Sequence, residues 1–354
     1  MKKYSKNQKN ILISGYYGFD NFGDEAILGV LTEKLKEWNC NIKVLSKNPA
    51  KTKLLYLVDS VKSFCLSKVI LSIMKCDVLI SGGGSLLQDV TSLKSLLYYL
   101  WVINMALFFK KKVIIFAQGI GPINNRFGRF LTKQTLKKCD LITVRDDKSL
   151  FLLRGWGLKP ELVCDPLFDV KLEKSMPSDK IGVQLRSFKT LKENLLIKLA
   201  EQINKEFSDR EIEIYSFQDS LDLDVCKRFE CILRSINPII QTKVIYNQSP
   251  QEILKKISRL DYMIAMRFHA NLIALKYGIK TLAINYDEKV EKLATEAKIP
   301  FLSMLADENY GNLFNQLKHL SKNELIEFAD TKHFDWTNIE ETVKGGNSLK
   351  QALD

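Results

Sequence analysis

Short apolar runs alternate with longer amphipathic stretches along most of this chain. In the first half, runs typical of buried strands cover Ile11–Ser14, Ile42–Leu45, Val78–Ser81, Val113–Ala117, Leu141–Val144 and Glu161–Cys164. Most are separated by helical patterns. Residues Glu25–Trp38 show the period well, because Ile27, Leu31 and Leu35 fall on one face. Strand–helix–strand alternation predicts a mostly parallel sheet covered on both faces.

The alternation stops at a polar stretch containing Pro177 and then starts again. Later strands are predicted at Ile181–Leu185, Ile212–Phe217, Lys243–Ile245, Tyr262–Ala265 and Thr281–Ile284, and helices at Leu191–Phe207, Asp224–Ile236, Pro250–Leu260, His269–Tyr277 and Asp287–Ala297. We therefore predict an α/β fold of two doubly wound, Rossmann-like domains facing a cleft. The expected boundaries are 1–170, a linker at 171–179, 180–335, and a tail at 336–354 that packs back on either domain.

In open α/β sheets, ligands bind beyond the carboxyl ends of the strands, so the residues just after each strand are the site candidates. After the first strand, Asn21, Gly23 and Asp24 lie in a glycine-containing loop that suits sugar hydroxyls better than phosphate. A tight turn with a helix cap explains this loop equally well. Gly82, Gly83 and Gly84 follow Val78–Ser81, with Asp89 downstream. Three consecutive glycines exceed what a turn needs, which favours a cradle of backbone N–H groups.

Cationic residues mark the ends of other strands. Arg145 follows Leu141–Val144, and a guanidinium there can hold a carboxylate or phosphate at two points or pair with its own neighbours. Arg267 and His269 follow Tyr262–Ala265, Lys289 lies in the first turn after Thr281–Ile284, and Arg186 follows Ile181–Leu185. His269 lies at a strand–helix junction beside Arg267, a position that suits proton transfer. The competing interpretation is a structural role, which is more common for a lone histidine. A solvated surface lysine is the competing interpretation of Lys289.

The composition of the chain limits the kinds of binding partner that we expect. The formal net charge is +12, which suggests an anionic partner such as a phosphorylated substrate, an anionic lipid or nucleic acid. Because the lysines are spread along the chain, we interpret most of them as solvating the surface, and the absence of an arginine-rich block argues against nucleic acid. Seven scattered cysteines without a CxxC pair indicate a reducing, cytoplasmic environment and no structural metal. Residues Leu96–Phe109 are almost wholly apolar and precede Lys110–Lys112. Fourteen residues are too few to span a bilayer of ~30 Å, so we favour a buried helix over a membrane-surface helix with a basic rim.

Five stretches, in order, resemble the polysaccharide pyruvyl transferase family that modifies bacterial cell-surface polysaccharides. They are Ser14–Leu28, Ile80–Leu100, Ala117–Ile123, Ile142–Leu150 and Met266–Gly278. The resemblance implies a two-domain fold of the glycosyltransferase-B type. It also implies transfer of pyruvate from phosphoenolpyruvate, a co-substrate, to a hexose or N-acetylhexosamine of a lipid-linked saccharide, with no cofactor.

By the same resemblance, His269, Arg145 and Lys289 are the catalytic candidates. The enzyme is expected in the cytoplasm, with peripheral contact to the anionic inner face of the membrane. Two alternatives remain open at this stage. One is a glycosyltransferase of the same fold that uses a nucleotide sugar, and the other is a non-catalytic protein of the membrane surface that binds lipid.

Overall fold

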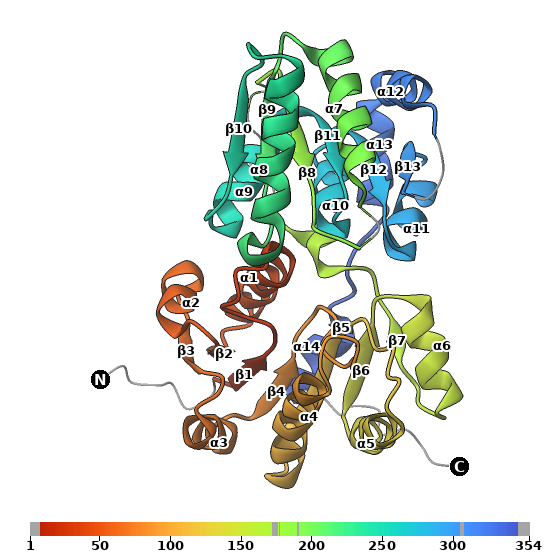
Figure 1. The fold of residues 1–354 in the computed structure, drawn as a ribbon. Helices are drawn as coiled ribbons and strands as arrows, with labels where there is room; N and C mark the ends of the chain where they lie inside the picture. Colours follow the sequence, from red (N-terminus) through yellow and green to blue (C-terminus); the bar gives the residue numbers. More distant parts are fainter. Residues whose placement is uncertain (1–7, 172–175, 177, 190, 305–307, 346–354) are drawn as a thin grey trace. The chain divides into compact units, whose positions relative to one another are not determined.

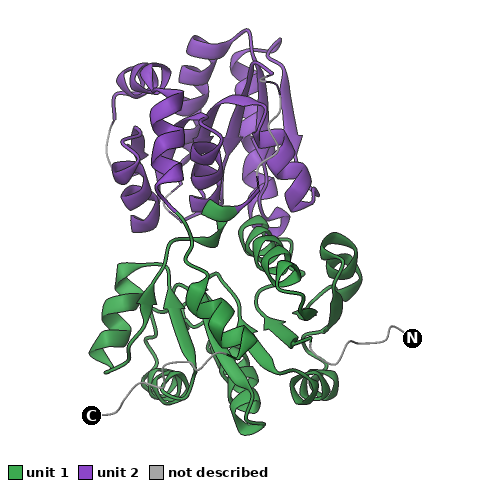
Figure 2. Ribbon diagram, turned by 180° about the vertical axis from the view of Figure 1, so that it is seen from behind, with its two compact units in different colours: residues 1–169, 333–354 green, residues 170–332 purple. Residues whose placement is uncertain are grey.

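The chain forms two compact units, which we describe separately. The computed structural model describes residues 8–171, 176, 178–189, 191–304 and 308–345. The first unit comprises residues 1–169 together with 333–354, and the second comprises 170–332 (Figure 2). Much of the predicted linker at 171–179 lies outside the described residues, as does the tail beyond residue 345.

The first unit is built on a seven-stranded parallel sheet in the order β3-β2-β1-β4-β5-β6-β7 (Figure 1). Its strands are β1 (Asn10–Ser14), β2 (Asn41–Ser46), β3 (Asp59–Lys62), β4 (Val78–Ser81), β5 (Lys112–Gln118), β6 (Leu141–Val144) and β7 (Glu161–Leu162). Five of the six strands predicted here are recovered almost to the residue, and the sixth, β7, is shorter. Sequence analysis missed β3, because this short edge strand, DSVK, buries little more than Ser60 and shows no apolar run.

Helices of the first unit are α1 (Phe22–Glu37), α2 (Pro49–Tyr56), α3 (Leu66–Lys75), α4 (Leu93–Phe108), α5 (Arg126–Leu136), α6 (Asp147–Gly155) and α14 (Thr337–Lys344), with a 3₁₀ turn at Pro166–Asp169. Helix α4 contacts both α3 and α5, so these three form one layer. The apolar segment Leu96–Phe109 is the body of α4, and it sends Leu96, Tyr99, Leu100, Val102, Ile103 and Ala106 into the core. One face of this helix is therefore buried, as the buried-helix interpretation predicts.

The chain returns to the first unit at its end. Phe334 and Trp336 pack on Phe116 of β5, with ring centroids 5.2 and 5.6 Å apart. The carboxylate of Asp169 accepts hydrogen bonds from the Phe334 backbone N–H (3.1 Å) and the Trp336 indole N–H (2.7 Å). Helix α14 then contacts β5 and β6. The crossing at residue 333 comes two residues before the predicted end of the second domain.

The second unit repeats the design with a six-stranded parallel sheet in the order β10-β9-β8-β11-β12-β13. Its strands are β8 (Lys180–Gln184), β9 (Glu211–Tyr215), β10 (Thr242–Ile245), β11 (Leu260–Ala265), β12 (Lys280–Asn285) and β13 (Phe301–Ser303). Its helices are α7 (Glu193–Phe207), α8 (Asp219–Ile236), α9 (Pro250–Ile257), α10 (Phe268–Lys276), α11 (Glu288–Glu296), α12 (Tyr310–His319) and α13 (Lys322–Asp330). Only β13, three residues long, had no predicted counterpart among these strands.

Candidate functional site

Each sheet has one point where the strand order reverses, and the predicted motifs follow the strands on either side of it. In the first unit, β1 lies between β2 and β4, so the reversal falls between β1 and β4. The loop with Asn21 and Gly23 follows β1, and Gly82–Gly84 follow β4. The crevice at such a reversal is where open α/β sheets bind ligands.

The loop after β1 is organised as a helix cap. The Asn21 side chain accepts a hydrogen bond from the Gly23 N–H (3.2 Å) and so caps α1. Glu25 is buried in the first turn, where its carboxylate accepts from the Gly18 N–H (2.6 Å) and the Tyr56 hydroxyl (2.7 Å). Burial raises the pKa of Glu25. Asn21 and Glu25 thus stabilise the turn and the start of α1, and contact of Asn21 with a sugar stays a prediction.

The three consecutive glycines are each in close contact with a neighbour. A Cβ on Gly82 would lie 2.0 Å from the Tyr17 hydroxyl oxygen, and one on Gly83 would lie 2.8 Å from Ile27. Gly84 has φ +96°, and a Cβ there would lie 2.3 Å from a carboxylate oxygen of Asp24. No larger side chain fits at these positions without displacing the neighbours. Close packing therefore requires the glycines, whether or not they also contact a ligand.

Tyr17 and Asp24 are the polar side chains that lie against Gly82 and Gly84. The Tyr17 side chain is fully buried, and its hydroxyl has no hydrogen-bond partner within the described part of the chain. Burial, followed by the charge of Asp24, raises the pKa of Tyr17 well above its usual value. The neutral Tyr17 hydroxyl can donate a hydrogen bond.

Gln118 organises the glycine loop and was not predicted. Its amide nitrogen lies within hydrogen-bond distance of the Ser81 carbonyl (3.0 Å), the Ser81 hydroxyl (2.8 Å) and the Gly82 carbonyl (3.1 Å). The side chain is fully buried at the end of β5. The sequence did contain a signal for this role, because Gln118 is a polar residue at the end of an apolar strand and directly before Gly119.

Asp89 joins two loops of the same edge. Its carboxylate accepts from the backbone N–H groups of Asn124 (2.9 Å) and Asn125 (2.7 Å), and these bonds lower its pKa. Predicted as a substrate ligand, Asp89 uses both oxygens to fasten the loop after β5 to the loop after β4.

Arg145, at the end of β6, is engaged by a carboxylate of its own unit. Its Nη1 lies 2.7 Å from an oxygen of Asp165, whose side chain is 2% exposed. The other Asp165 oxygen accepts from the Leu167 N–H (3.1 Å). Sequence analysis left open whether Arg145 grips a ligand or pairs locally. The structure contains the local pair, and it assigns Arg145 to a different unit from His269 and Lys289.

In the second unit, the reversal falls between β8 and β11, and cationic residues gather there. Arg186 follows β8, Arg267 and His269 follow β11, and Lys289 follows β12, the next strand in the sheet. His269 is the second residue of α10, and Lys289 is the second residue of α11. Both side chains are partly exposed. Three adjacent parallel strands thus bring these predicted residues to one edge.

Arg267 is held by a buried ion pair. Its Nε and Nη2 donate to the two oxygens of Asp222 at 2.8 and 2.7 Å, and the Asp222 side chain is fully buried. Asp222 also accepts from the backbone N–H groups of Phe217 and Gln218. Asp222 was missed because it lies inside α8, five residues after the nearest predicted strand. The pair fixes the guanidinium at the sheet edge.

Arg186 is oriented by aromatic side chains. Its guanidinium lies 5.7 Å from the ring centre of Tyr286, and its Nη1 is 3.5 Å from the Tyr286 hydroxyl. Tyr286 packs against Phe188. The Arg186 Nε is buried and has no hydrogen-bond partner within the described residues. A buried guanidinium N–H without a partner can donate a hydrogen bond to an anionic ligand.

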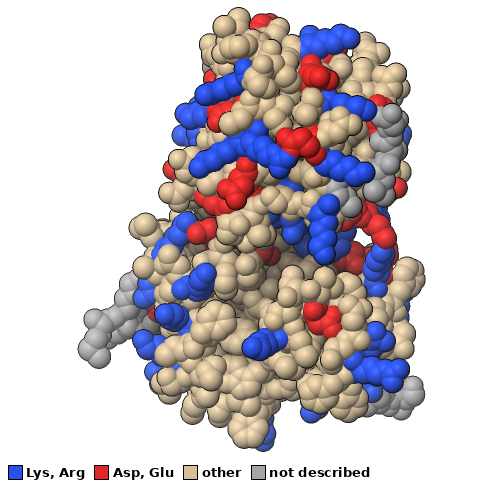
Figure 3. Space-filling view, in the orientation of Figure 1, with Lys and Arg blue, Asp and Glu red and all other residues tan. Residues whose placement is uncertain are grey.

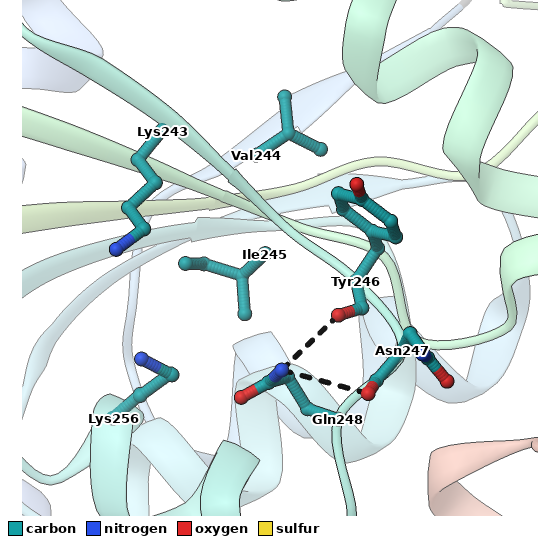
Figure 4. Close-up of a pocket in the computed structure, with 7 residues that line it drawn as sticks. All are labelled: Lys243, Val244, Ile245, Tyr246, Asn247, Gln248 and Lys256. Carbon is teal, nitrogen blue, oxygen red and sulfur yellow. Dashed lines mark hydrogen bonds between the residues drawn. The ribbon is translucent and has the colours of Figure 1, made fainter.

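Other features lie away from these edges. A cavity of about 360 Å³ adjoins β10 at the border of the second sheet, lined by Lys243, Val244, Ile245, Tyr246, Asn247, Gln248 and Lys256 (Figure 4). It contains none of the predicted site residues. Across the described ranges, His, Cys, Asp and Glu form no group of three that could hold a metal ion. Over the same ranges, every helix is too short or too polar to cross a bilayer.

Comparisons with known proteins identify a family and a fold. A family model described as polysaccharide pyruvyl transferase matches residues 21–288. A search of curated proteins returned no significant match.

Solved structures resemble the chain over nearly its whole length. A UDP-GlcNAc 2-epimerase from Methanocaldococcus jannaschii has a TM-score of 0.61 at 11% identity, covering 92% of this chain and 99% of that one. The epimerase from Neisseria meningitidis gives 0.59 at 11% identity, covering 95% and 98%. Sucrose-phosphate synthase from Thermosynechococcus elongatus gives 0.56 at 9% identity, covering 94% and 96%. At these identities the likeness shows the fold alone, which is that of glycosyltransferase-B enzymes and UDP-GlcNAc 2-epimerases.

Proposed function

Because this chain belongs to the polysaccharide pyruvyl transferase family, we propose that it moves pyruvate from phosphoenolpyruvate onto a sugar of a lipid-linked polysaccharide precursor. The acceptor is a hexose or N-acetylhexosamine, the product is a pyruvate ketal, and the by-product is phosphate. The reaction takes place in the cytoplasm, at the inner face of the membrane, and uses no cofactor.

The observation that carries this proposal is the cationic edge of the second unit. Arg186, His269 and Lys289 follow three adjacent strands, and Arg267 is fixed beside them by Asp222. Phosphoenolpyruvate carries a carboxylate and a phosphate, so it needs cationic donors at two places. The buried Arg186 Nε supplies one such donor. Arg145 is the further candidate to bind the donor's anionic groups, in competition with its pair to Asp165.

The reaction then proceeds by proton transfer and addition. A proton is added to the methylene carbon of phosphoenolpyruvate, which makes the neighbouring carbon electrophilic. One sugar hydroxyl adds to that carbon and loses its proton, and the carbon–oxygen bond to phosphate breaks. A second hydroxyl of the same sugar attacks the same carbon and closes the ketal. Of the two protons lost by the hydroxyls, one balances the new methyl group and the other leaves with phosphate.

His269 is suited to move these protons, as acid toward carbon or as base toward the hydroxyl. Lys289, Arg267 and Arg186 stabilise the departing phosphate electrostatically. In the first unit, the loops with Asn21, Gly23, Gly82–Gly84 and Asp89 bind the acceptor. The Asp24 carboxylate beside Gly84 suits neutral hydroxyls better than anions.

The test is phosphate release from phosphoenolpyruvate in the presence of a nitrophenyl or lipid-linked hexosaminide. We expect release that depends on the acceptor, and an acceptor product that gains the mass of a pyruvate ketal. Turnover with nucleotide sugars instead would favour a glycosyltransferase of the same fold. No turnover with either donor would leave the non-catalytic, lipid-binding alternative.

A further inference from the structure

The layer formed by α3, α4 and α5 in the first unit has an unusual surface. None of the three helices contains an aspartate or glutamate, whereas they carry Lys68, Lys75, Lys94, Arg126, Arg129 and Lys133. The turn after α4 adds Lys110, Lys111 and Lys112. By contrast, α7 and α8 of the second unit interleave both signs of charge. Figure 3 shows mainly tan and blue over α4 but mixed blue and red over α7 and α8.

Large apolar side chains are exposed on the same layer. On and beside α3, Phe64, Leu66, Leu71 and Met74 are 50 to 58% exposed, and Phe108 at the end of α4 is 73% exposed. On α5, Phe127 and Phe130 are 61 and 58% exposed. Isolated apolar residues on a surface are ordinary, but here they gather on one layer.

Side-chain contacts connect α3 with α4 on this layer. The Phe64 ring lies 5.3 Å from that of Tyr98 on α4, and Tyr98 lies 6.3 Å from Trp101. At the other end, the Lys111 ammonium donates to the Met74 carbonyl at 2.8 Å, which brings the basic turn beside the exposed end of α3. Helix α4 contacts α5 along its other side. Exposed apolar and basic groups therefore occur on all three helices of this layer.

We propose that this α3–α4–α5 layer docks on the surface of an anionic lipid bilayer. Interfacial proteins combine exposed Phe, Leu and Trp, which enter the headgroup boundary, with Lys and Arg that face anionic lipid. The charge of the layer favours a lipid bilayer over a second copy of the chain as the binding partner. A two-fold dimer through this layer would place like charges against each other, because none of the three helices carries an acidic residue.

This surface differs from the one expected from sequence. Sequence analysis centred the membrane contact on Leu96–Lys112, but the core-facing side of α4 is occupied by packing within the unit. Most of the large apolar side chains that are at least half exposed on this layer lie on or beside α3 and on α5 instead. The inference is independent of the reaction catalysed, since it rests on exposure and charge alone.

The experiment is co-sedimentation of the purified full chain with vesicles of phosphatidylglycerol and phosphatidylcholine, compared with phosphatidylcholine alone. We expect binding to the anionic vesicles that weakens at high salt. The double variant Lys68→Glu and Lys75→Glu should reduce the partition coefficient by at least about tenfold, since each basic residue near the surface contributes on the order of a fivefold gain. Leu71→Gln with Met74→Gln should reduce it as well, with a smaller change in salt dependence.

Matched controls lie in the second unit. Ile239→Gln removes an apolar side chain that is 88% exposed, and Lys205→Glu with Lys255→Glu reverses two exposed lysines. These variants should bind as the parent does. Turnover with a water-soluble acceptor should be unchanged in the α3 variants, which separates docking from catalysis.

Three outcomes would overturn the proposal. They are no binding to anionic vesicles at low salt, equal losses in the control variants, and a dimer in solution that the α3 variants dissociate. The last would show that the layer is an interface between copies. Because all substituted residues are exposed, melting temperatures close to the parent's are expected and should be checked.

Discussion

The two units share one topology but carry different chemistry at the point where their strand order reverses. In the first unit, the β1–β4 edge is neutral to acidic, with glycines packed against Tyr17, Ile27 and Asp24. In the second, the β8–β11 edge is cationic, with Arg186 and Arg267 at the strand ends. The fold therefore fixes where a ligand can bind, and the side chains after the strands determine which kind.

Each unit also buries an arginine–aspartate pair at the end of a strand. Arg267 contacts both oxygens of Asp222, which accepts two further backbone N–H groups. Arg145 contacts one oxygen of Asp165 through Nη1, and the other Asp165 oxygen accepts the Leu167 N–H. In both units, a buried carboxylate of the same unit therefore orients a guanidinium beside a strand end.

The largest effect expected from this comparison is on catalysis in the second unit. His269→Ala should lower kcat by about 10²–10⁴, the usual contribution of a general acid or base, without unfolding the protein. His319→Ala is the control, because His319 is exposed on α12 of the same unit. Steady-state phosphate release measures both. If His269→Ala keeps more than about a tenth of the parent rate, the catalytic assignment is wrong.

Loss of either buried carboxylate should destabilise the protein. Asp222→Ala leaves a buried guanidinium without its carboxylate and should lower the free energy of unfolding by about 3–5 kcal/mol. Asp165→Ala removes the carboxylate beside Arg145, whose side chain is about as buried as that of Arg267, and should cost a similar amount. Urea unfolding of the parent and both variants measures the two losses. A loss of less than about 1 kcal/mol, as for an exposed ion pair, would contradict the prediction for that pair.

Substitution of Arg145 tests whether the first unit contributes to donor binding. Arg145→Lys keeps the charge but loses the planar fork that contacts two oxygens. We expect the half-saturation for phosphoenolpyruvate to rise by about tenfold, the equivalent of one charged hydrogen bond. If the donor constant stays unchanged while acceptor use is altered, Arg145 belongs to the sugar side.

The smallest expected effect is that of metal removal. If cationic side chains neutralise the departing phosphate, activity should survive treatment with EDTA. Activity lost in EDTA and restored by magnesium or manganese would contradict the cationic-edge model. It would also favour a nucleotide sugar as donor, since a diphosphate leaving group often recruits a divalent ion.

Periodicity determined most of the architecture. Buried parallel strands need continuous apolar runs, so β1, β4, β6, β8 and β11 were readable from sequence within a residue or two. The edge strands β3 and β13 were not, because pairing on one side and partial exposure leave no such run. The placement of Arg186, His269 and Lys289 at strand ends also followed from the sequence, since parallel strands share one carboxyl edge.

The tertiary structure determined the contacts between residues that are far apart in the sequence, which no local pattern indicates. The burial of Asp222 under Arg267, of Asp165 beside Arg145, and of Gln118 beneath the glycine loop arises between residues 20 to 45 positions apart. The glycines after β4 indicated a special backbone, but their neighbours Tyr17, Ile27 and Asp24 emerged only from packing. Likewise, the sequence shows that α3, α4 and α5 lack acidic residues. Only their assembly into one layer turns that composition into a surface, because helix contacts decide which side chains remain in water.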